Sequence, residues 1–234
     1  MPTDQPQQVT KRPEQRPPTS IHGRYRGPKR QAPNPVPAGV IDTSALPEPD
    51  ALPLLFDQPA PLVLDIGFGK GELLAHMAQT YSHWNFIGCE IFYPGIDALC
   101  KQIEQRQLHN VKIVLIDARD LIANYLTDAC LERVHLFFPD PWPKRRHQKR
   151  RLIQPDFCQL IHRRLKPLGS VHLATDSEAL ASWIPSCFKE PDLWQAASDP
   201  QTQALVEQNP SRFAQRGLRK GHSIHQFSFK KRQQ

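Results

Sequence analysis

Residues 63–74 read VLDIGFGKGELL: a short apolar run, an acid, three glycines at alternate positions and the start of a helical pattern. A short apolar run that ends in glycines is typical of a buried strand followed by a tight turn. Gly67, Gly69 and Gly71 allow a close approach of the backbone to a ligand, and the helix after them offers free N–H groups. The stretch therefore predicts a ligand-binding strand–turn–helix unit of an α/β fold.

The chain after Pro61 repeats this alternation of short apolar runs and helical patterns, which is typical of parallel β-α units. A late segment alternates apolar and polar residues, which favours an antiparallel strand. We predict a doubly wound, mostly parallel sheet whose ligands bind at the carboxyl ends of its strands. The predicted strands are 62–66, 85–89, 112–116, 134–138, 171–174 and the late 224–229, and the predicted helices are 72–80, 96–107, 119–125 and 156–164.

Residues 1–60 contain more than half of the 24 prolines and few aromatic residues. Such a segment buries too little apolar surface to fold alone, so we expect a basic, partly disordered tail. Residues 21–30 carry four basic side chains around Tyr25, and this part is either tail or an arm that orders on nucleic acid. The expected domain therefore spans residues 61–234.

The composition narrows the class of protein. The net charge of +7 makes a polyanion the first partner to consider. Five widely spaced cysteines without a C-x-x-C pair favour reduced thiols, and the scattered histidines offer no metal site. The chain shows no apolar run of membrane-spanning length and no signal-peptide pattern, so we expect a soluble, cytoplasmic protein.

Acids stand at the carboxyl ends of three consecutive predicted strands. Asp65 lies beside the glycine turn, Glu90 closes the next strand, and Asp117 follows the third. Each acid alone is as well explained by a helix cap or a surface charge, but three acids at one edge of a sheet favour a ligand site. Glu72 stands where the dinucleotide fingerprint needs its third glycine, which favours S-adenosylmethionine over NAD.

Residues 134–151 read VHLFFPDPWPKRRHQKRR, which is a predicted strand, an acid among prolines and a basic run. Prolines cannot continue a central sheet, so they direct the chain out at the carboxyl end of that strand in a stiff path. Asp140 is thereby placed beside the expected ligand. Trp142 either stacks on a substrate base or packs as a hinge, and the basic run is either an RNA contact or a solvated face.

These motifs resemble the tRNA (guanine-N7-)-methyltransferases. The similarity rests on the F-F-P-D-P-W-P-K segment at 137–144 with R-H-x-K-R-R after it, on A-T-D-S at 174–177 and on residues 212–222, and it extends from about Pro61 to the C-terminus. It implies a Rossmann-like class I methyltransferase domain. It also implies methyl transfer from S-adenosylmethionine to N7 of guanosine 46 in the variable loop of tRNA.

The resemblance implies roles for individual residues. Asp140 belongs to the catalytic centre. The residues expected at the cofactor are Asp65, Gly67, Gly69, Gly71, Glu90, Asp117 and Asp140, and those expected at the substrate are Lys144, Asp176, Ser211, Arg212 and Phe213. The chain departs from the family at Ala214, where relatives carry an acid, so another residue replaces that contact or it is absent.

The two basic groups of the matched segments are expected to contact RNA phosphates. They are Arg145, Arg146, Lys149, Arg150, Arg151 and Arg216. Two alternatives stay open at this point: a class I methyltransferase that acts on another RNA base or on a protein, and an RNA-binding protein of the same fold without catalysis. The residues do not decide between a monomer, a homo-oligomer and an enzyme with a helper subunit.

Overall fold

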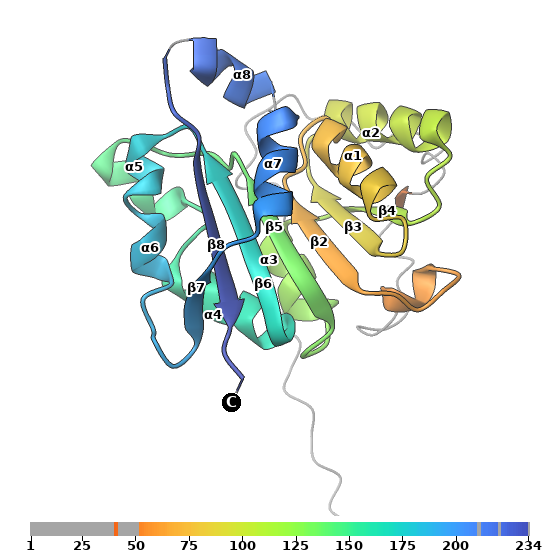
Figure 1. The fold of residues 1–234 in the computed structure, drawn as a ribbon, viewed down its shortest axis with the longest axis horizontal. Helices are drawn as coiled ribbons and strands as arrows, with labels where there is room; N and C mark the ends of the chain where they lie inside the picture. Colours follow the sequence, from red (N-terminus) through yellow and green to blue (C-terminus); the bar gives the residue numbers. More distant parts are fainter. Residues whose placement is uncertain (1–39, 42–51, 210–211, 220, 234) are drawn as a thin grey trace, which may run out of the picture.

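The computed structural model describes residues 40–41, 52–209, 212–219 and 221–233. A central sheet lies between two layers of helices (Figure 1). The strands are β1 (Val40–Ile41), β2 (Leu62–Ile66), β3 (Asn85–Glu90), β4 (Val111–Leu115), β5 (Leu131–Phe137), β6 (Leu165–Thr175), β7 (Trp194–Ala197) and β8 (His225–Lys231). The helices are α1 (Glu72–Thr80), α2 (Tyr93–Arg106), α3 (Ala118–Asn124), α4 (Pro155–Arg164), α5 (Glu178–Ala181), α6 (Ile184–Cys187), α7 (Pro200–Gln208) and α8 (Arg212–Arg219), with the 3-10 helices η4 (Pro53–Leu55) and η5 (Arg145–Arg150).

In the described part of the chain the sheet has the order β1-β4-β3-β2-β5-β6-β8-β7. Strands β1 to β6 pair in parallel, whereas β8 runs antiparallel to both β6 and β7. From β2 the chain builds outward through β3 and β4, and it then returns to place β5 on the other side of β2. This reversal creates the crevice in which doubly wound sheets bind ligands. The predicted fold class, with its late antiparallel strand, is confirmed.

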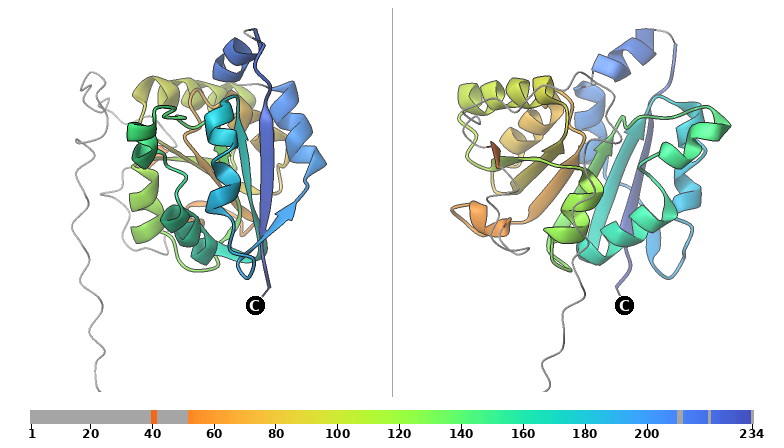
Figure 2. Two further views of the ribbon diagram at one scale, coloured as in Figure 1. Left: turned by 90° about the vertical axis from the view of Figure 1, so that its left-hand side faces the viewer. Right: turned by 180° about the vertical axis from the view of Figure 1, so that it is seen from behind.

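Two apolar clusters cover the two faces of the sheet. On β2, Leu62, Leu64 and Ile66 belong to the cluster with α3, α4 and α6, while Val63 belongs to the cluster with α1, α2 and α7. The alternation follows from the two-residue period of a strand, so Asp65 shares the face of Val63. Figure 2 shows the two helical layers from the side and from behind.

The folded domain begins before Pro61, the predicted domain boundary. Leu52 and Phe56 are buried in the core beneath η4, and β1 adds a short parallel edge strand to β4. The expectation of a tail up to residue 60 is therefore corrected for residues 52–60, because these two side chains bury apolar area against the domain. The disorder expected for residues 1–39 and 42–51, and the arm at 21–30, lie outside the described residues.

The five cysteines are free thiols, and Cys89, Cys158 and Cys187 are buried. None of the helices in the described ranges has the length and apolar character that a membrane crossing requires.

Candidate active site at the carboxyl ends of the strands

The glycine turn connects β2 to α1 with three left-handed residues. Gly67, Gly69 and Gly71 have φ values of 71°, 60° and 75°, a region that side chains rarely adopt. A Cβ atom at Gly67 or Gly69 would meet nothing within 4 Å, whereas one at Gly71 would lie 2.7 Å from Leu99 of α2. The first two glycines therefore border open space, and the third allows the turn to pack against α2.

Glu90 fixes the position of this turn from the end of β3. Its Oε2 accepts the N–H of Gly69 at 3.0 Å, and its Oε1 accepts the N–H groups of Ile91 and Phe92 at 2.7 and 3.0 Å. Burial raises the pKa of Glu90, and the three backbone donors oppose that shift. Of the about four lone-pair sites of the carboxylate, one remains on Oε2, so it can accept a further hydrogen bond from a hydroxyl group of a ligand.

Asp65 lies within β2 rather than after it, and its side chain is only 3% exposed. Burial raises the pKa of this carboxyl from 3.8 to about 7. Its Oδ2 lies 3.8 Å from Nδ1 of His135 on the neighbouring strand. A buried carboxylate of this kind favours a cationic partner, because an opposite charge offsets the desolvation of the ionised form.

Asp117 follows β4 and caps α3. Its Oδ1 accepts the N–H of Arg119 at 2.9 Å, which is the usual geometry of an N-cap carboxylate. The helix-cap explanation is therefore correct for one oxygen. The other oxygen remains available to a ligand at the same edge of the sheet, so capping and ligand binding are compatible.

The segment that carries Asp140 leaves β5 through an unusual backbone. Phe138 and Trp142 have φ values of 54° and 40°, although neither is glycine. The N–H of Phe138 donates to the carbonyl oxygen of Ala174 on β6 at 2.7 Å, so the segment is still attached to the sheet where it turns. Asp140 is exposed between Pro139 and Pro141. Backbone strain of this kind persists only where surrounding contacts hold it, and it is frequent at active sites.

Arg151 provides one of these contacts. Its buried position disagrees with the expectation that this residue contacts an RNA phosphate. The residue is 3% exposed, its Nε donates to the carbonyl oxygen of Pro141 at 2.9 Å, and its guanidinium lies over the ring of Trp183 at 5.3 Å. A buried guanidinium bonded to backbone carbonyls cannot reach an RNA backbone. The last basic residue of the run is therefore part of the support of the Asp140 segment.

The other Lys and Arg residues of the run lie on η5 or directly before it, and they are exposed. Arg150 lies over the ring of Trp142 at 5.0 Å, and the ring of His147 meets that ring edge-on at 5.8 Å. Trp142 thus packs against the basic helix, which favours the hinge explanation over stacking on a base. The exposed members are Lys144, Arg145, Arg146, Lys149 and Arg150.

Helix α8 contains part of the segment that is predicted to contact the substrate. In Figure 1 this helix stands beyond the upper ends of β6 and β8. Its Gly217 lies against Asp176, which follows β6: a Cβ at Gly217 would be 2.4 Å from Oδ2 of Asp176. His222 Nδ1 lies 3.8 Å from the same oxygen. The structure therefore brings this helix and Asp176 together.

Some predicted substrate residues are placed only in part. Ser211 lies outside the described residues, and the side chains of Arg212, Phe213 and Arg216 do as well, although their backbone belongs to α8. Sequence reasoning missed the pairing of His135 with Asp65. The alternation of β5 indicates the face on which His135 lies, but no local pattern reveals the register that brings it beside Asp65.

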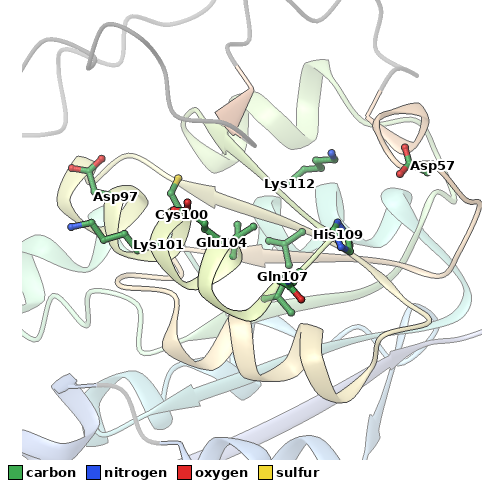
Figure 3. A pocket seen from close by; sticks show the side chains of 11 residues that line it. Asp57, Asp97, Cys100, Lys101, Glu104, Gln107, His109 and Lys112 are labelled. Carbon is green, nitrogen blue, oxygen red and sulfur yellow. The ribbon is translucent and has the colours of Figure 1, made fainter.

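A separate open groove of about 790 Å³ lies along α2 and the amino end of β4 (Figure 3). Its lining mixes acids such as Asp97 and Glu104 with bases such as Lys101 and Lys112. None of the predicted site residues whose side chains the structure describes lines this groove. It is therefore a different surface from the edge that carries the glycine turn.

Comparisons with known proteins point to one family. A family model described as "Putative methyltransferase" matches residues 59–227. The tRNA (guanine-N(7)-)-methyltransferase of Cupriavidus pinatubonensis is 43% identical over 180 residues, which cover 76% of this chain and 70% of that protein. The enzyme of the same name from Halorhodospira halophila is 40% identical over 198 residues, which cover 83% and 81%.

Solved structures show the same fold at low identity. An rRNA methylase from Streptococcus thermophilus matches with a TM-score of 0.51 at 12% identity, over 74% of this chain and 88% of that one. A SAM-dependent O-methyltransferase from Thermotoga maritima matches with a TM-score of 0.50 at 14% identity, over 75% and 60%. These similarities concern the fold alone.

Proposed function

The chain belongs to the tRNA (guanine-N(7)-)-methyltransferase family, and we propose that it transfers the methyl group of S-adenosylmethionine to N7 of guanosine 46 in the variable loop of tRNA. The observation that supports this most is one shared edge of the sheet. The glycine turn, the three acids Asp65, Glu90 and Asp117, and the Asp140 segment after β5 all lie at the carboxyl ends of the adjacent parallel strands β4, β3, β2 and β5.

The residues of this edge fit S-adenosylmethionine. Open space borders Gly67 and Gly69. The Asp65 carboxylate can hold the cationic amino-acid end, the remaining acceptor site of Glu90 can take a ribose hydroxyl, and Asp117 can accept an adenine amino group. The cofactor supplies an electrophilic methyl group on a sulfonium centre, so the protein needs to bind and orient rather than to activate that group.

Asp140 is proposed as the catalytic residue. Guanine N7 is a lone-pair acceptor without a proton, so no general base is needed before attack. Methylation makes the purine ring cationic. A fixed carboxylate that accepts from the N–H edge of guanine would orient the base and stabilise the developing positive charge. The backbone contacts of Phe138 and the anchor at Arg151 support such a fixed position.

Two basic surfaces would bind the RNA around this point. The exposed residues Lys144, Arg145, Arg146, Lys149 and Arg150 leave from the end of β5. Helix α8, whose Gly217 lies against Asp176, includes Arg212, Phe213 and Arg216 in its sequence, and Ser211 precedes it along the chain. The two groups lie on segments that leave the carboxyl edge of the sheet, so we propose that they contact phosphates on both sides of the target base. The free thiols fit a reducing compartment, and we propose a cytoplasmic enzyme.

Incubation of the purified chain with labelled S-adenosylmethionine and an unmodified tRNA transcript tests the proposal, followed by mapping of the labelled nucleotide. We expect N7-methylguanosine at position 46. A transcript in which adenosine replaces this guanosine is the matched control and should accept no label. Label on another base would instead support a methyltransferase of different specificity, and S-adenosylmethionine binding without any transfer would contradict the catalytic proposal.

A further inference from the structure

A row of polar side chains crosses the interior of the sheet. Asp65 on β2 is in register with His135 on β5, His135 with His172 on β6, and His172 with Ser228 on β8. All four side chains are buried. They lie on the face that α1 and α7 cover, beside apolar residues such as Val63. Four polar groups at one level of an apolar layer need an explanation, because burial of unpaired polar groups is unfavourable.

The outer end of the row is well paired. His172 hydrogen-bonds through Nε2 with Ser170 Oγ at 2.8 Å and through Nδ1 with Ser228 Oγ at 3.0 Å. Asp199 Oδ2 lies 3.7 Å from His172 Nε2 and 3.0 Å from Nη1 of Arg133. This end therefore has the properties of a structural network.

His135 differs from His172 in this respect. Among the described residues neither ring nitrogen of His135 has a hydrogen-bond partner, although both are buried. The ring lies near the rings of Phe137 and His172, at centroid distances of 5.0 and 5.7 Å. The polar group that Nδ1 approaches is Oδ2 of Asp65, at 3.8 Å. This distance is about 1 Å longer than a hydrogen bond, so a small adjustment of the Asp65 side chain closes it.

We propose that His135 is a positioning residue for Asp65: its Nδ1–H donates to Oδ2 of the ionised carboxylate and leaves the other oxygen, Oδ1, to hold the cationic end of the cofactor. This inference rests on the proposed S-adenosylmethionine site. A buried carboxyl group must be ionised to hold a cation, and a hydrogen-bond donor beside it favours the ionised form. The buried ring of His135 is that donor.

The charges around the pair agree with this role. Burial raises the pKa of Asp65 to about 7, and burial, with Arg133 nearby, lowers the pKa of His135 to about 3. The ring is therefore neutral and contributes a hydrogen bond rather than a charge. The other titratable groups on this face near the pair are Glu90 on β3, His172 on β6 and Asp199 ahead of α7, whereas Cys89 on β3 belongs to the cluster on the opposite face of the sheet.

Two nearly isosteric substitutions separate positioning from packing. His135→Asn keeps a donor close to the place of Nδ1, whereas His135→Leu fills similar space without one. In cofactor-free protein labelled with ¹³C at its carboxyl groups, the Asp65 titration midpoint should rise by about one pH unit in His135→Leu. This is about a tenfold change in the ionisation constant of Asp65. It should stay near the wild-type value in His135→Asn. Equal midpoints in wild type and His135→Leu would overturn the inference.

Binding of S-adenosylmethionine gives the second measurement. At pH 7 the ionised fraction of Asp65 should fall from about one half to about one tenth in His135→Leu, so calorimetry should show about fivefold weaker binding to this variant. Binding to His135→Asn should be like that of wild type, with thermal melting as the control for folding. The ¹⁵N signals of the His135 ring in wild type should shift toward the Nδ1–H form when the cofactor binds, and this readout needs no variant. Failure of wild type to bind the cofactor, with a shifted Asp65 midpoint in His135→Leu, would reject the proposed function and leave the His135–Asp65 pairing intact.

Discussion

The Nε of Arg151 donates to the carbonyl oxygen of Pro141 at 2.9 Å, so the end of the basic run is tied to the residue directly after Asp140. The guanidinium is buried over the ring of Trp183, whose Nε1 donates to the carbonyl oxygen of Ile153 at 2.8 Å. The exposed loop that carries Asp140 is thus attached to the packed interior. A loop that must hold Asp140 in one position gains its rigidity from this attachment.

Replacing Arg151 should affect stability and turnover rather than RNA charge contacts. Arg151→Gln leaves buried carbonyl oxygens without their donor, which should lower the free energy of unfolding by about 1–3 kcal/mol. Turnover should fall by about tenfold because the Asp140 loop loosens. Urea denaturation and single-turnover methylation measure the two effects. The exposed neighbour substitution Arg150→Gln is the control for charge, and equal stability of the two variants would show that the anchor is unimportant.

Asp140→Asn should separate chemistry from cofactor binding. The amide keeps the size of the side chain but not the charge that would stabilise a cationic purine, so turnover should fall by about 100-fold or more. Affinity for S-adenosylmethionine, measured by calorimetry, should stay within a few-fold of wild type. Near-normal turnover of the variant would remove Asp140 from the catalytic role.

The basic surface around η5 should contribute to the salt dependence of tRNA binding. Removing two exposed charges, in Arg145→Gln with Arg146→Gln, should reduce the slope of log affinity against log salt by about 1–2, since each phosphate contact contributes about 0.7–0.9. A matched pair on α2, Lys101→Gln with Arg106→Gln, removes the same charge on a different helix and should leave the slope nearly unchanged. Equal slopes for the two double variants would exclude η5 from the footprint.

Gly217→Ala tests the contact between α8 and the sheet. The new Cβ would lie 2.4 Å from Oδ2 of Asp176, so the helix or the acid must move. Alanine favours a helix more than glycine does, by about 1 kcal/mol, so a loss of activity cannot come from weaker helix formation. We expect about tenfold lower kcat/KM for tRNA with unchanged cofactor affinity. Leu218→Ala, an exposed change on the same helix, is the control, and full activity of Gly217→Ala would show that this contact is dispensable.

The buried side chains of Asp65 and His135 should also affect how the free energy of unfolding depends on pH. His135 has a pKa near 6.5 when unfolded and about 3 when folded, so its contribution is present above pH 6.5 and is lost as the pH falls toward 3. Asp65, with a pKa raised from 3.8 to about 7, contributes in the opposite direction and loses its contribution as the pH rises through 7. Between pH 4 and 6, His135 therefore adds about 1.4 kcal/mol per pH unit to the slope of the unfolding free energy against pH, and Asp65 subtracts about the same amount.

Denaturation at several pH values measures this pair of slopes. Relative to wild type, the slope of unfolding free energy against pH should decrease in His135→Leu and increase in Asp65→Asn. His109→Leu, at an exposed position, is the control and should leave the slope unchanged. The buried arrangement is contradicted if His135→Leu behaves like His109→Leu.

Local sequence patterns predicted much of the fold. The predicted strand 62–66 and helix 72–80 agree with β2 and α1 residue for residue, because an apolar run, three glycines and a helical period are all local signals. The gathering of acids at one edge was also predictable, since parallel strands end on the same side. The short elements α5, α6 and β7 were not predicted, because four residues carry too little pattern to be distinguished from a loop.

The sequence by itself determined the class of fold, the order of its motifs and the residue types at the strand ends. Only the tertiary structure decided which of these residues meet. Arg151 fixes the Asp140 loop because it packs over Trp183 and donates to the carbonyl oxygen of Pro141. His135 lies beside Asp65 because of the register between β5 and β2. Periodicity determines the face on which a side chain lies, whereas register and burial depend on packing between segments far apart in the chain.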